Sequence, residues 1–403
     1  MKHKLYYIVV LFLLNSHFSH ALKGIPIALY PSGEVPNSKP APAGLYEIYN
    51  GNYFHVTRPT LTPYIPNKAI ATKAAVLVIA GGSYSGIAIQ DEGYATAQKF
   101  CDAGITAFVL KYRLPDARIM TDRSIGPLQD AQRALQMIRQ RASEWNLDST
   151  KIGVIGFSAG GHLASTLGTH FNTPMIPNPD NISLRPDFMI LMYPVITMGP
   201  YTHRESKDSL LGKTPSAELV NLFSNEKQVT VNTPPTFIVH SSTDNVVPQR
   251  NSILFCTALL EKNVLFEKHF YTTGTHGYGL NSPDPKESMI GLVQTWMSKN
   301  GWLPDLTSIK DSKVDGSPLL NAFPNPFIKD FSVSFKLPVS DQNVTLAIYD
   351  SKGVMLKSIS LSNIEAGKVY THSFNAIQFN KGLYLLKLTT SHQTFTEKIL
   401  KTN

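Results

Sequence analysis

The sequence predicts an α/β domain with a mostly parallel, doubly wound sheet, followed by a smaller all-β sandwich domain. Buried strand patterns alternate with helical patterns between about residues 70 and 303, and strand patterns alone follow Trp302. The length of 403 residues also exceeds the size at which one hydrophobic core usually stops growing. We therefore expect two folded domains.

The chain begins with the pattern of a secretory signal peptide. Lys2 and Lys4 precede an apolar run of about ten residues, and small residues follow at the expected cleavage site. A helix needs ~20 apolar residues to cross a bilayer, so a retained membrane anchor is the less favoured interpretation. We expect residues 1–21 to be removed during export and the mature protein to begin near Leu22.

Residues 22–303 are predicted to form the α/β domain. Up to about residue 66 the chain is rich in Pro, Asn and Gly, and the short strand patterns 53–56 and 61–65 suggest a small antiparallel edge. The elements expected after it are strand 74–80, helix 92–103, strand 105–112, helix 128–145, strands 152–156, 188–193 and 236–241, helix 250–261, strand 265–271 and helix 286–299. This alternation predicts a parallel sheet with helices on both faces.

The tail, residues 319–403, follows a polar linker at 304–318 and is predicted to be a β-sandwich. Its strands are expected at 332–337, 344–350, 354–361, 369–375, 382–390 and 394–401. Turn signals such as Asp-Ser-Lys-Gly separate them, and no segment of the tail has a helical pattern.

Composition and charge exclude several classes of protein. Apolar residues make up 42% of the chain and charged residues 16%, which excludes wholesale disorder. The net charge is +8, but no basic run concentrates it, so binding of nucleic acid is disfavoured. Cys101 and Cys256 are too few for a disulfide scaffold and lack the paired spacing of a zinc site. We expect both cysteines to be buried in helices and the protein to need no metal or organic cofactor.

The clearest chemical motif is Gly156-Phe-Ser158-Ala-Gly160, which lies between a buried strand and an apolar helical run. In this context a G-x-S-x-G sequence presents its serine on a sharp turn, where only glycines fit on either side. The helix N-terminus also favours an anion beside the serine. Ser158 is therefore the candidate nucleophile, and an ordinary Gly-rich turn is the alternative.

A serine nucleophile needs a base, and the base needs an orienting carboxylate. Asp244 follows the strand at 236–241, at the carboxyl end of the sheet where α/β sites form, although it could instead cap the next helix. His276 lies in a Gly-rich loop after the last strand and is the candidate base, with a surface histidine as the alternative. The weaker candidates are Asp187, His162, His240, Glu261, Glu267 and His269.

Acyl transfer also needs N–H donors for the oxyanion that forms on the carbonyl. The residue after the nucleophile, Ala159, supplies one donor. The loop after the first parallel strand contains two consecutive glycines, and Gly82 or Ser83 is expected to supply the other. A simple tight turn is the alternative interpretation of this loop.

Several stretches resemble the α/β-hydrolase carbohydrate esterases of the acetyl xylan and bifunctional feruloyl/acetyl esterase type. The resemblance covers about residues 44 to 303 and is carried by residues 80–86, 91–94, 110–114, 130–134, 156–162 and 275–278. It implies an α/β-hydrolase fold and a triad of Ser158, Asp244 and His276. It also implies an oxyanion hole lined by Gly82, Ser83 and Ala159. These enzymes commonly have a third glycine at the position of Ser83, so the second donor is left open.

The tail has a separate resemblance. Residues 321–327, 348–353 and 381–384 look like the C-terminal sorting domain of the type IX secretion system. That resemblance implies passage across the outer membrane, with the secretion machinery as a partner, and release or attachment at the cell surface. A carbohydrate-binding module is the alternative.

Together these features predict a secreted serine esterase that removes acetyl groups, or alternatively feruloyl groups, from plant polysaccharides such as xylan or pectin. The expected substrate partner is an acetylated polysaccharide or oligosaccharide. The alternatives are a serine peptidase or general carboxylesterase of the same fold and a catalytically inactive glycan-binding protein. The polar segment 169–186 offers no apolar lid, which predicts a short acyl pocket. Tyr84 either limits that pocket or packs against the sheet.

Overall fold

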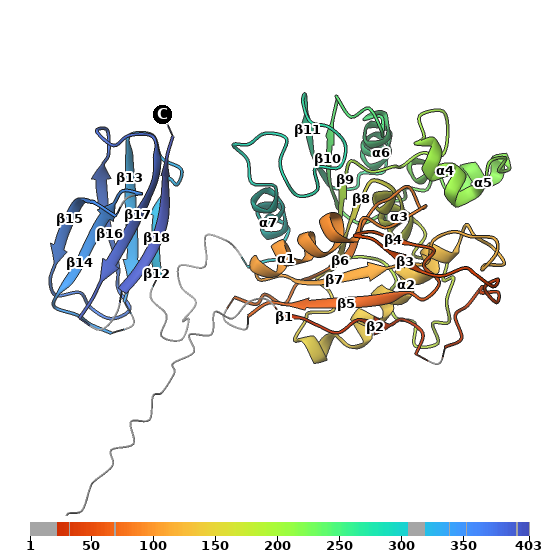
Figure 1. Ribbon diagram of the computed structural model, residues 1–403, viewed down its shortest axis with the longest axis horizontal. Coiled ribbons are helices and arrows are strands. Elements are labelled where there is room, and N and C mark those ends of the chain that lie inside the picture. The colour runs from red at the N-terminus through yellow and green to blue at the C-terminus, as the bar shows by residue number, and fades with distance from the viewer. Residues whose placement is uncertain are drawn as a thin grey trace, which may run out of the picture. The chain divides into compact units, whose positions relative to one another are not determined.

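The computed structural model describes residues 22–31, 33–67, 70–304, 319–337, 339–351, 353–391 and 394–402. The expected signal peptide, residues 1–21, and residues 305–318 of the expected linker lie outside these ranges. The chain divides into two compact units between residues 310 and 311 (Figure 1). Among the described helices, none has the length and apolar character needed to cross a membrane.

The first unit is built on a nine-stranded sheet. Its strand order is β1-β5-β7-β6-β8-β9-β10-β11, and β2 pairs with β5. The strands are β1 (Leu22–Lys23), β2 (Ile27–Ala28), β5 (Thr60–Ile65), β6 (Ala75–Ile79), β7 (Thr106–Lys111), β8 (Ile152–Phe157), β9 (Met189–Met192), β10 (Thr236–Ser241) and β11 (Phe266–Tyr271). All pairings from β7 to β11 are parallel, whereas β1, β2 and β5 form an antiparallel edge.

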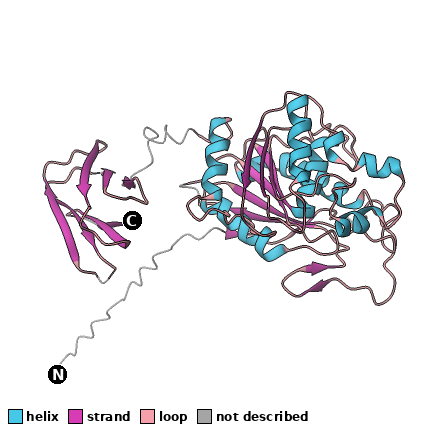
Figure 2. Cartoon of the chain, turned by 90° about the horizontal axis from the view of Figure 1, so that it is seen from above, coloured by secondary structure: helices cyan, strands magenta, loops and turns pink. Residues whose placement is uncertain are grey.

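Helices cover both faces of this sheet (Figure 2). They are the π-helix Ile89–Tyr94, α1 (Ala95–Asp102), α2 (Gly126–Gln140), α3 (Ser158–Thr169), α4 (Arg204–Leu211), α5 (Ala217–Leu222), α6 (Arg250–Glu261) and α7 (Met289–Lys299), with short 3₁₀ turns at Ala142–Trp145 and Asn225–Lys227. Every residue of β6, β8 and β10 is buried, as expected for parallel strands covered on both faces. The predicted fold class is therefore confirmed. Cys101 and Cys256 are both buried, in α1 and α6.

Two details of the first unit differ from the sequence-based expectation. The strand pattern at 53–56 does not pair with the one at 61–65. It forms β4 (Tyr53–Phe54), which pairs with β3 (Ile48–Tyr49), while β5 joins the main sheet beside β7. Helices α4 and α5 were not expected, because both are short and α5 buries none of its residues, which leaves no apolar periodicity to detect.

The second unit consists of two antiparallel sheets. One has the order β12-β13-β16 and the other β15-β14-β17-β18. The strands are β12 (Leu319–Phe323), β13 (Asp330–Lys336), β14 (Val344–Tyr349), β15 (Met355–Leu361), β16 (Val369–Asn375), β17 (Gly382–Thr389) and β18 (Thr394–Lys401). Along β13 buried residues alternate with more exposed ones, and Phe331, Val333 and Phe335 enter one core. The expected β-sandwich is therefore observed, and β12 is a strand that the sequence did not predict.

Candidate active site

Ser158 lies at the sharp turn between β8 and α3. Its backbone has a φ of 51°, a left-handed conformation that non-glycine residues rarely adopt. A Cβ atom at Gly156 would lie 2.3 Å from the carbonyl oxygen of Gly160, and one at Gly160 would lie 2.3 Å from that of Ile79. Both flanking positions therefore require glycine, and the strained turn holds Ser158 at the carboxyl end of the parallel strands.

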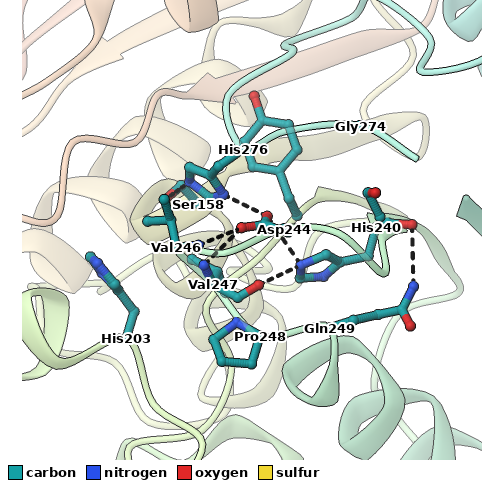
Figure 3. A network of polar contacts seen from close by, with 12 residues as sticks. Ser158, His203, His240, Asp244, Val246, Val247, Pro248, Gln249, Gly274 and His276 are labelled. Atoms are coloured by element: carbon teal, nitrogen blue, oxygen red, sulfur yellow. Dashed lines mark hydrogen bonds and ion pairs between the residues drawn. The ribbon is translucent and has the colours of Figure 1, made fainter. Parts of the chain in front are cut away.

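The structure brings Ser158, His276 and Asp244 into one chain of hydrogen bonds (Figure 3). Nδ1 of His276 lies 2.7 Å from Oδ2 of Asp244, and Nε2 lies 2.9 Å from Oγ of Ser158. Because a carboxylate accepts hydrogen bonds, Nδ1 carries the imidazole proton. Nε2 is then free to accept the proton of the serine hydroxyl. This is the geometry of an activated serine nucleophile.

The loop after β10 holds Asp244 as an anion. Its Oδ1 accepts hydrogen bonds from the N–H groups of Val246 and Val247, each at 2.9 Å. Burial by itself would raise the pKa of this carboxyl group. Hydrogen bonds from His240 and His276 outweigh that effect and hold its pKa well below the usual range. The N-cap of α6 is Gln249, so Asp244 does not cap that helix.

His240 supports Asp244 from the strand beneath it. Nε2 of His240 lies 2.9 Å from the carbonyl oxygen of Val247 and 3.3 Å from Oδ2 of Asp244, so this nitrogen donates to the loop. Nδ1 lies 2.7 Å from Oγ of Ser252. The other weaker candidates make contacts away from the triad: His162 with Tyr84 and Phe223, His269 with Glu267, and Asp187 with Arg139.

The backbone amides proposed for the oxyanion hole lie at the N-terminus of α3 and in the loop after β6. Ala159 is the second residue of α3, so its N–H group has no acceptor within the helix. Gly82 and Ser83 both have positive φ angles, 122° and 56°, and neither N–H group has an acceptor among the described residues. Either amide can serve as the second donor. Tyr84 is buried and donates a hydrogen bond of 2.8 Å to Nδ1 of His162, so it packs inside the domain.

Sequence reasoning missed three side chains near the triad. His203, just before α4, lies close enough to His276 and Asp244 to interact with their charges, and its Nδ1 lies 2.9 Å from Oγ of Ser206 (Figure 3). Burial lowers the pKa of His203 despite the nearby carboxylates. Glu92 and Tyr193 form a buried pair beside the loop after β6 that contains Gly81, Gly82 and Ser83, here called the oxyanion loop after its proposed role. The stretch 91–94 carried part of the family resemblance, so it was the one available signal for Glu92.

A polar groove runs beside the oxyanion loop. One part is lined by residues that include His203, Glu205 and Lys213, and another by residues that include His55 and Ser85. The two parts share Arg123 and Ser209, so they adjoin each other. Ser85 donates a hydrogen bond of 3.1 Å to Oε1 of Glu205, which ties α4 to the oxyanion loop. In the described part of the chain, no group of three or more His, Cys, Asp or Glu side chains is arranged to hold a metal ion.

Comparisons with protein families match both units. Residues 61–259 match the family model described as BD-FAE. Residues 321–402 match the model described as secretion system C-terminal sorting domain.

Two curated relatives each match more than half of this chain. Endo-1,4-beta-xylanase B of Butyrivibrio fibrisolvens is 42% identical over 231 residues, which are 57% of this chain and 36% of that protein. The acetylxylan esterase of Xylanibacter ruminicola is 29% identical over 275 residues, which are 67% of this chain and 53% of that protein. The chain thus spans about a third to a half of the length of these relatives.

Solved structures show the same architecture. The acetyl ester-xyloside bifunctional hydrolase from Caldicellulosiruptor lactoaceticus is 35% identical, with a TM-score of 0.61, and the alignment covers 71% of this chain and 99% of that one. An esterase from Thermogutta terrifontis is 22% identical, with a TM-score of 0.51 and coverage of 68% and 96%. The second likeness supports the fold alone.

Proposed function

The chain belongs to the BD-FAE family of α/β-hydrolase esterases and ends in a secretion-system sorting domain, and on this premise we propose that it is an exported deacetylase of xylan. The observation that carries this proposal is the chain of hydrogen bonds from Asp244 through His276 to Ser158 on the strained turn after β8. The names of two relatives, an acetylxylan esterase and an acetyl ester-xyloside hydrolase, support the choice of acyl group and glycan.

In the proposed reaction, Oγ of Ser158 attacks the acetyl carbonyl carbon while its proton moves to Nε2 of His276. The carbonyl oxygen becomes an oxyanion, which accepts hydrogen bonds from Ala159 and from Gly82 or Ser83. Asp244 stabilises the imidazolium that forms.

His276 then gives the proton to the oxygen of the departing sugar, and the C–O bond breaks to leave acetyl-Ser158. Water attacks this intermediate in the second half of the reaction, with His276 as base. The bond to Ser158 breaks, the serine regains its proton, and acetate leaves.

The groove beside the oxyanion loop is the proposed site for the sugar. It offers both hydrogen-bond donors and acceptors, including the imidazole of His203 and the carboxylate of Glu205. Such mixed polar lining suits the hydroxyl groups of a sugar better than a long acyl chain. A feruloyl ester is the second candidate for the acyl group, and a general carboxylesterase is the second candidate for the activity.

For the tail we propose a role in export. The match of residues 321–402 to a sorting domain supports passage to the cell surface or the outside by the type IX machinery. On this proposal residues 1–21 are cleaved, residues 22–303 form the catalytic domain, and residues 319–403 are the sorting domain. A carbohydrate-binding tail is the competing assignment, and binding of the isolated tail to insoluble xylan would favour it.

The test is release of acetate and ferulate from a panel of substituted xylans and pectins, with Ser158→Ala as the inactive control. We expect the wild-type protein to release acetate from xylan fastest. Hydrolysis of small activated esters without release from any glycan would instead favour a general carboxylesterase. Peptide cleavage by the wild-type protein, or glycan binding without hydrolysis, would favour the remaining alternatives.

A further inference from the structure

A buried chain of hydrogen bonds connects the oxyanion loop to the loop that carries His276. The N–H group of Gly81 donates to Oε2 of Glu92 at 2.7 Å, and the hydroxyl of Tyr193 donates to Oε1 at 2.8 Å. The N–H group of Gly279 in turn donates to the Tyr193 hydroxyl at 2.8 Å. Gly81 directly precedes the proposed oxyanion donors, and Gly279 lies three residues after His276.

Glu92 is an unusual residue to bury at this place. Its side chain lies in the π-helix Ile89–Tyr94 and is only 6% exposed, and no cation among the described residues pairs with it. Burial raises the pKa of Glu92, while the bonds from Gly81 and Tyr193 oppose that rise. A buried carboxyl group without a cation is costly, and π-helical segments often occur at functional sites. One carboxylate oxygen of Glu92 binds the oxyanion loop through Gly81, and the other binds the His276 loop through Tyr193.

The chain of contacts lies directly against the nucleophile and the base. A Cβ atom at Gly81 would lie 2.9 Å from Oε2 of Glu92 and 2.9 Å from Cβ of Ser158. The ring of Tyr193 meets the ring of His276 edge to face at 4.8 Å. Tyr193 adopts a φ of 38° at the end of β9, a strained conformation that places its ring and hydroxyl here.

We infer that Glu92 and Tyr193 are positioning residues that fix the oxyanion loop and the His276 loop relative to Ser158. The inference rests on the proposed function, because it concerns the groups that would stabilise the transition state. Neither residue is expected to touch the glycan. Their loss therefore lowers kcat and leaves KM nearly unchanged.

The first test is Tyr193→Phe, which removes the hydroxyl that joins the two loops. We expect kcat on p-nitrophenyl acetate to fall by about ten- to hundredfold, with KM changed by less than about twofold. Tyr278→Phe is the matched control. The ring of Tyr278 lies 4.6 Å from that of Tyr193, and its buried hydroxyl has no hydrogen-bond partner among the residues that the structure describes. This control should keep the wild-type kcat.

The second variant is Glu92→Gln, whose amide group cannot accept hydrogen bonds from both Gly81 and Tyr193. It should resemble Tyr193→Phe, and the double variant should be no slower than the slower single variant, because both substitutions break the same chain. Independent effects that multiply in the double variant would overturn the inference. If Tyr193→Phe does not fold, as judged by thermal unfolding, Glu92→Gln compared with Tyr278→Phe carries the test.

The rate at which an aryl phosphonate probe labels Ser158 gives a readout that needs no acyl substrate. Tyr193→Phe should lower this rate by a factor similar to the fall in kcat, whereas Tyr278→Phe should not. Wild-type protein that is labelled but releases no acetate from xylan would contradict the proposed function, and the inference would then be judged on labelling alone. Equal labelling rates in Tyr193→Phe, Glu92→Gln and Tyr278→Phe would overturn the inference. Failure of the probe to label Ser158 in the wild-type protein would also overturn it.

Discussion

Replacing Asp244 with Asn is expected to disable the site by reversing the tautomer of His276. In the wild-type protein Oδ1 of Asp244 accepts the N–H groups of Val246 and Val247. In Asp244→Asn the amide oxygen must keep this place, because an NH₂ group there would face two fixed backbone donors, whereas the groups that face Oδ2 are histidine nitrogens whose protons can move to the other ring nitrogen. The NH₂ group therefore points at Nδ1 of His276, which lies 2.7 Å from the other carboxylate oxygen.

A donor opposite Nδ1 forces the imidazole proton onto Nε2, the atom that lies 2.9 Å from Oγ of Ser158. His276 can then no longer accept the serine proton. Holding the wrong tautomer in a serine triad lowers kcat by about 10⁴-fold, which corresponds to about 5.5 kcal/mol of transition-state stabilisation. We expect a loss of that order in Asp244→Asn.

The assay is steady-state hydrolysis of p-nitrophenyl acetate by folded protein. Asp148→Asn is the control, because within the described part of the chain the Asp148 carboxylate accepts hydrogen bonds only from Thr150, in a turn before β8. This control should keep the wild-type kcat. A loss of less than about tenfold in folded Asp244→Asn would refute the tautomer argument and assign the orienting acid elsewhere.

Three further predictions follow from other parts of the molecule. If the acyl pocket is short, kcat/KM should fall from acetyl to octanoyl esters, whereas a steady rise, consistent with about 0.8 kcal/mol per buried methylene, would indicate a lipase-like pocket. Burial lowers the pKa of the His162 imidazole to about 4 in the folded protein, below its value of about 6.5 in the unfolded chain. The neutral imidazole therefore stabilises the fold fully above pH 6.5, and this contribution is lost as the pH falls through the folded pKa. Urea unfolding should therefore show about 2 kcal/mol less stability at pH 5 than at pH 7 from this residue, and the same pH dependence in His162→Gln would contradict that assignment. A chain that ends at Leu303 should keep esterase activity and lose export; intact export with lost action on insoluble xylan would show that the tail is a binding module.

Much of the fold could be predicted because its signals are local. The apolar runs of β6 and β8 are buried on both faces, and a strand covered in this way reads as a continuous hydrophobic stretch. The turn around Ser158 also has a local signal, since Gly156 and Gly160 flank the serine between a strand pattern and a helical pattern, although the steric need for Gly160 comes from Ile79 on the neighbouring strand β6. The local pattern alone therefore predicts Ser158 as the candidate nucleophile.

The features that sequence reasoning missed depend on contacts between distant segments. Tyr193 and Glu92 are 101 residues apart, and no pattern in either segment reveals their hydrogen bond. His240 lies in a buried strand, and its support of Asp244 appears only once the loop after β10 folds back over it. The pairing of β5 with β7 could not be predicted for the same reason, because the sequence of one strand does not specify which other strand it pairs with.

The central claim is that the reaction proceeds through an acyl-enzyme on Ser158. Rapid acid quench of the protein during turnover of an acetyl ester, followed by peptide mass spectrometry, tests it most directly. We predict one added acetyl group on the peptide that contains Ser158, and neither that adduct nor turnover in Ser158→Ala. Full activity in Ser158→Ala, or an acetyl group trapped on a different residue, would contradict the claim.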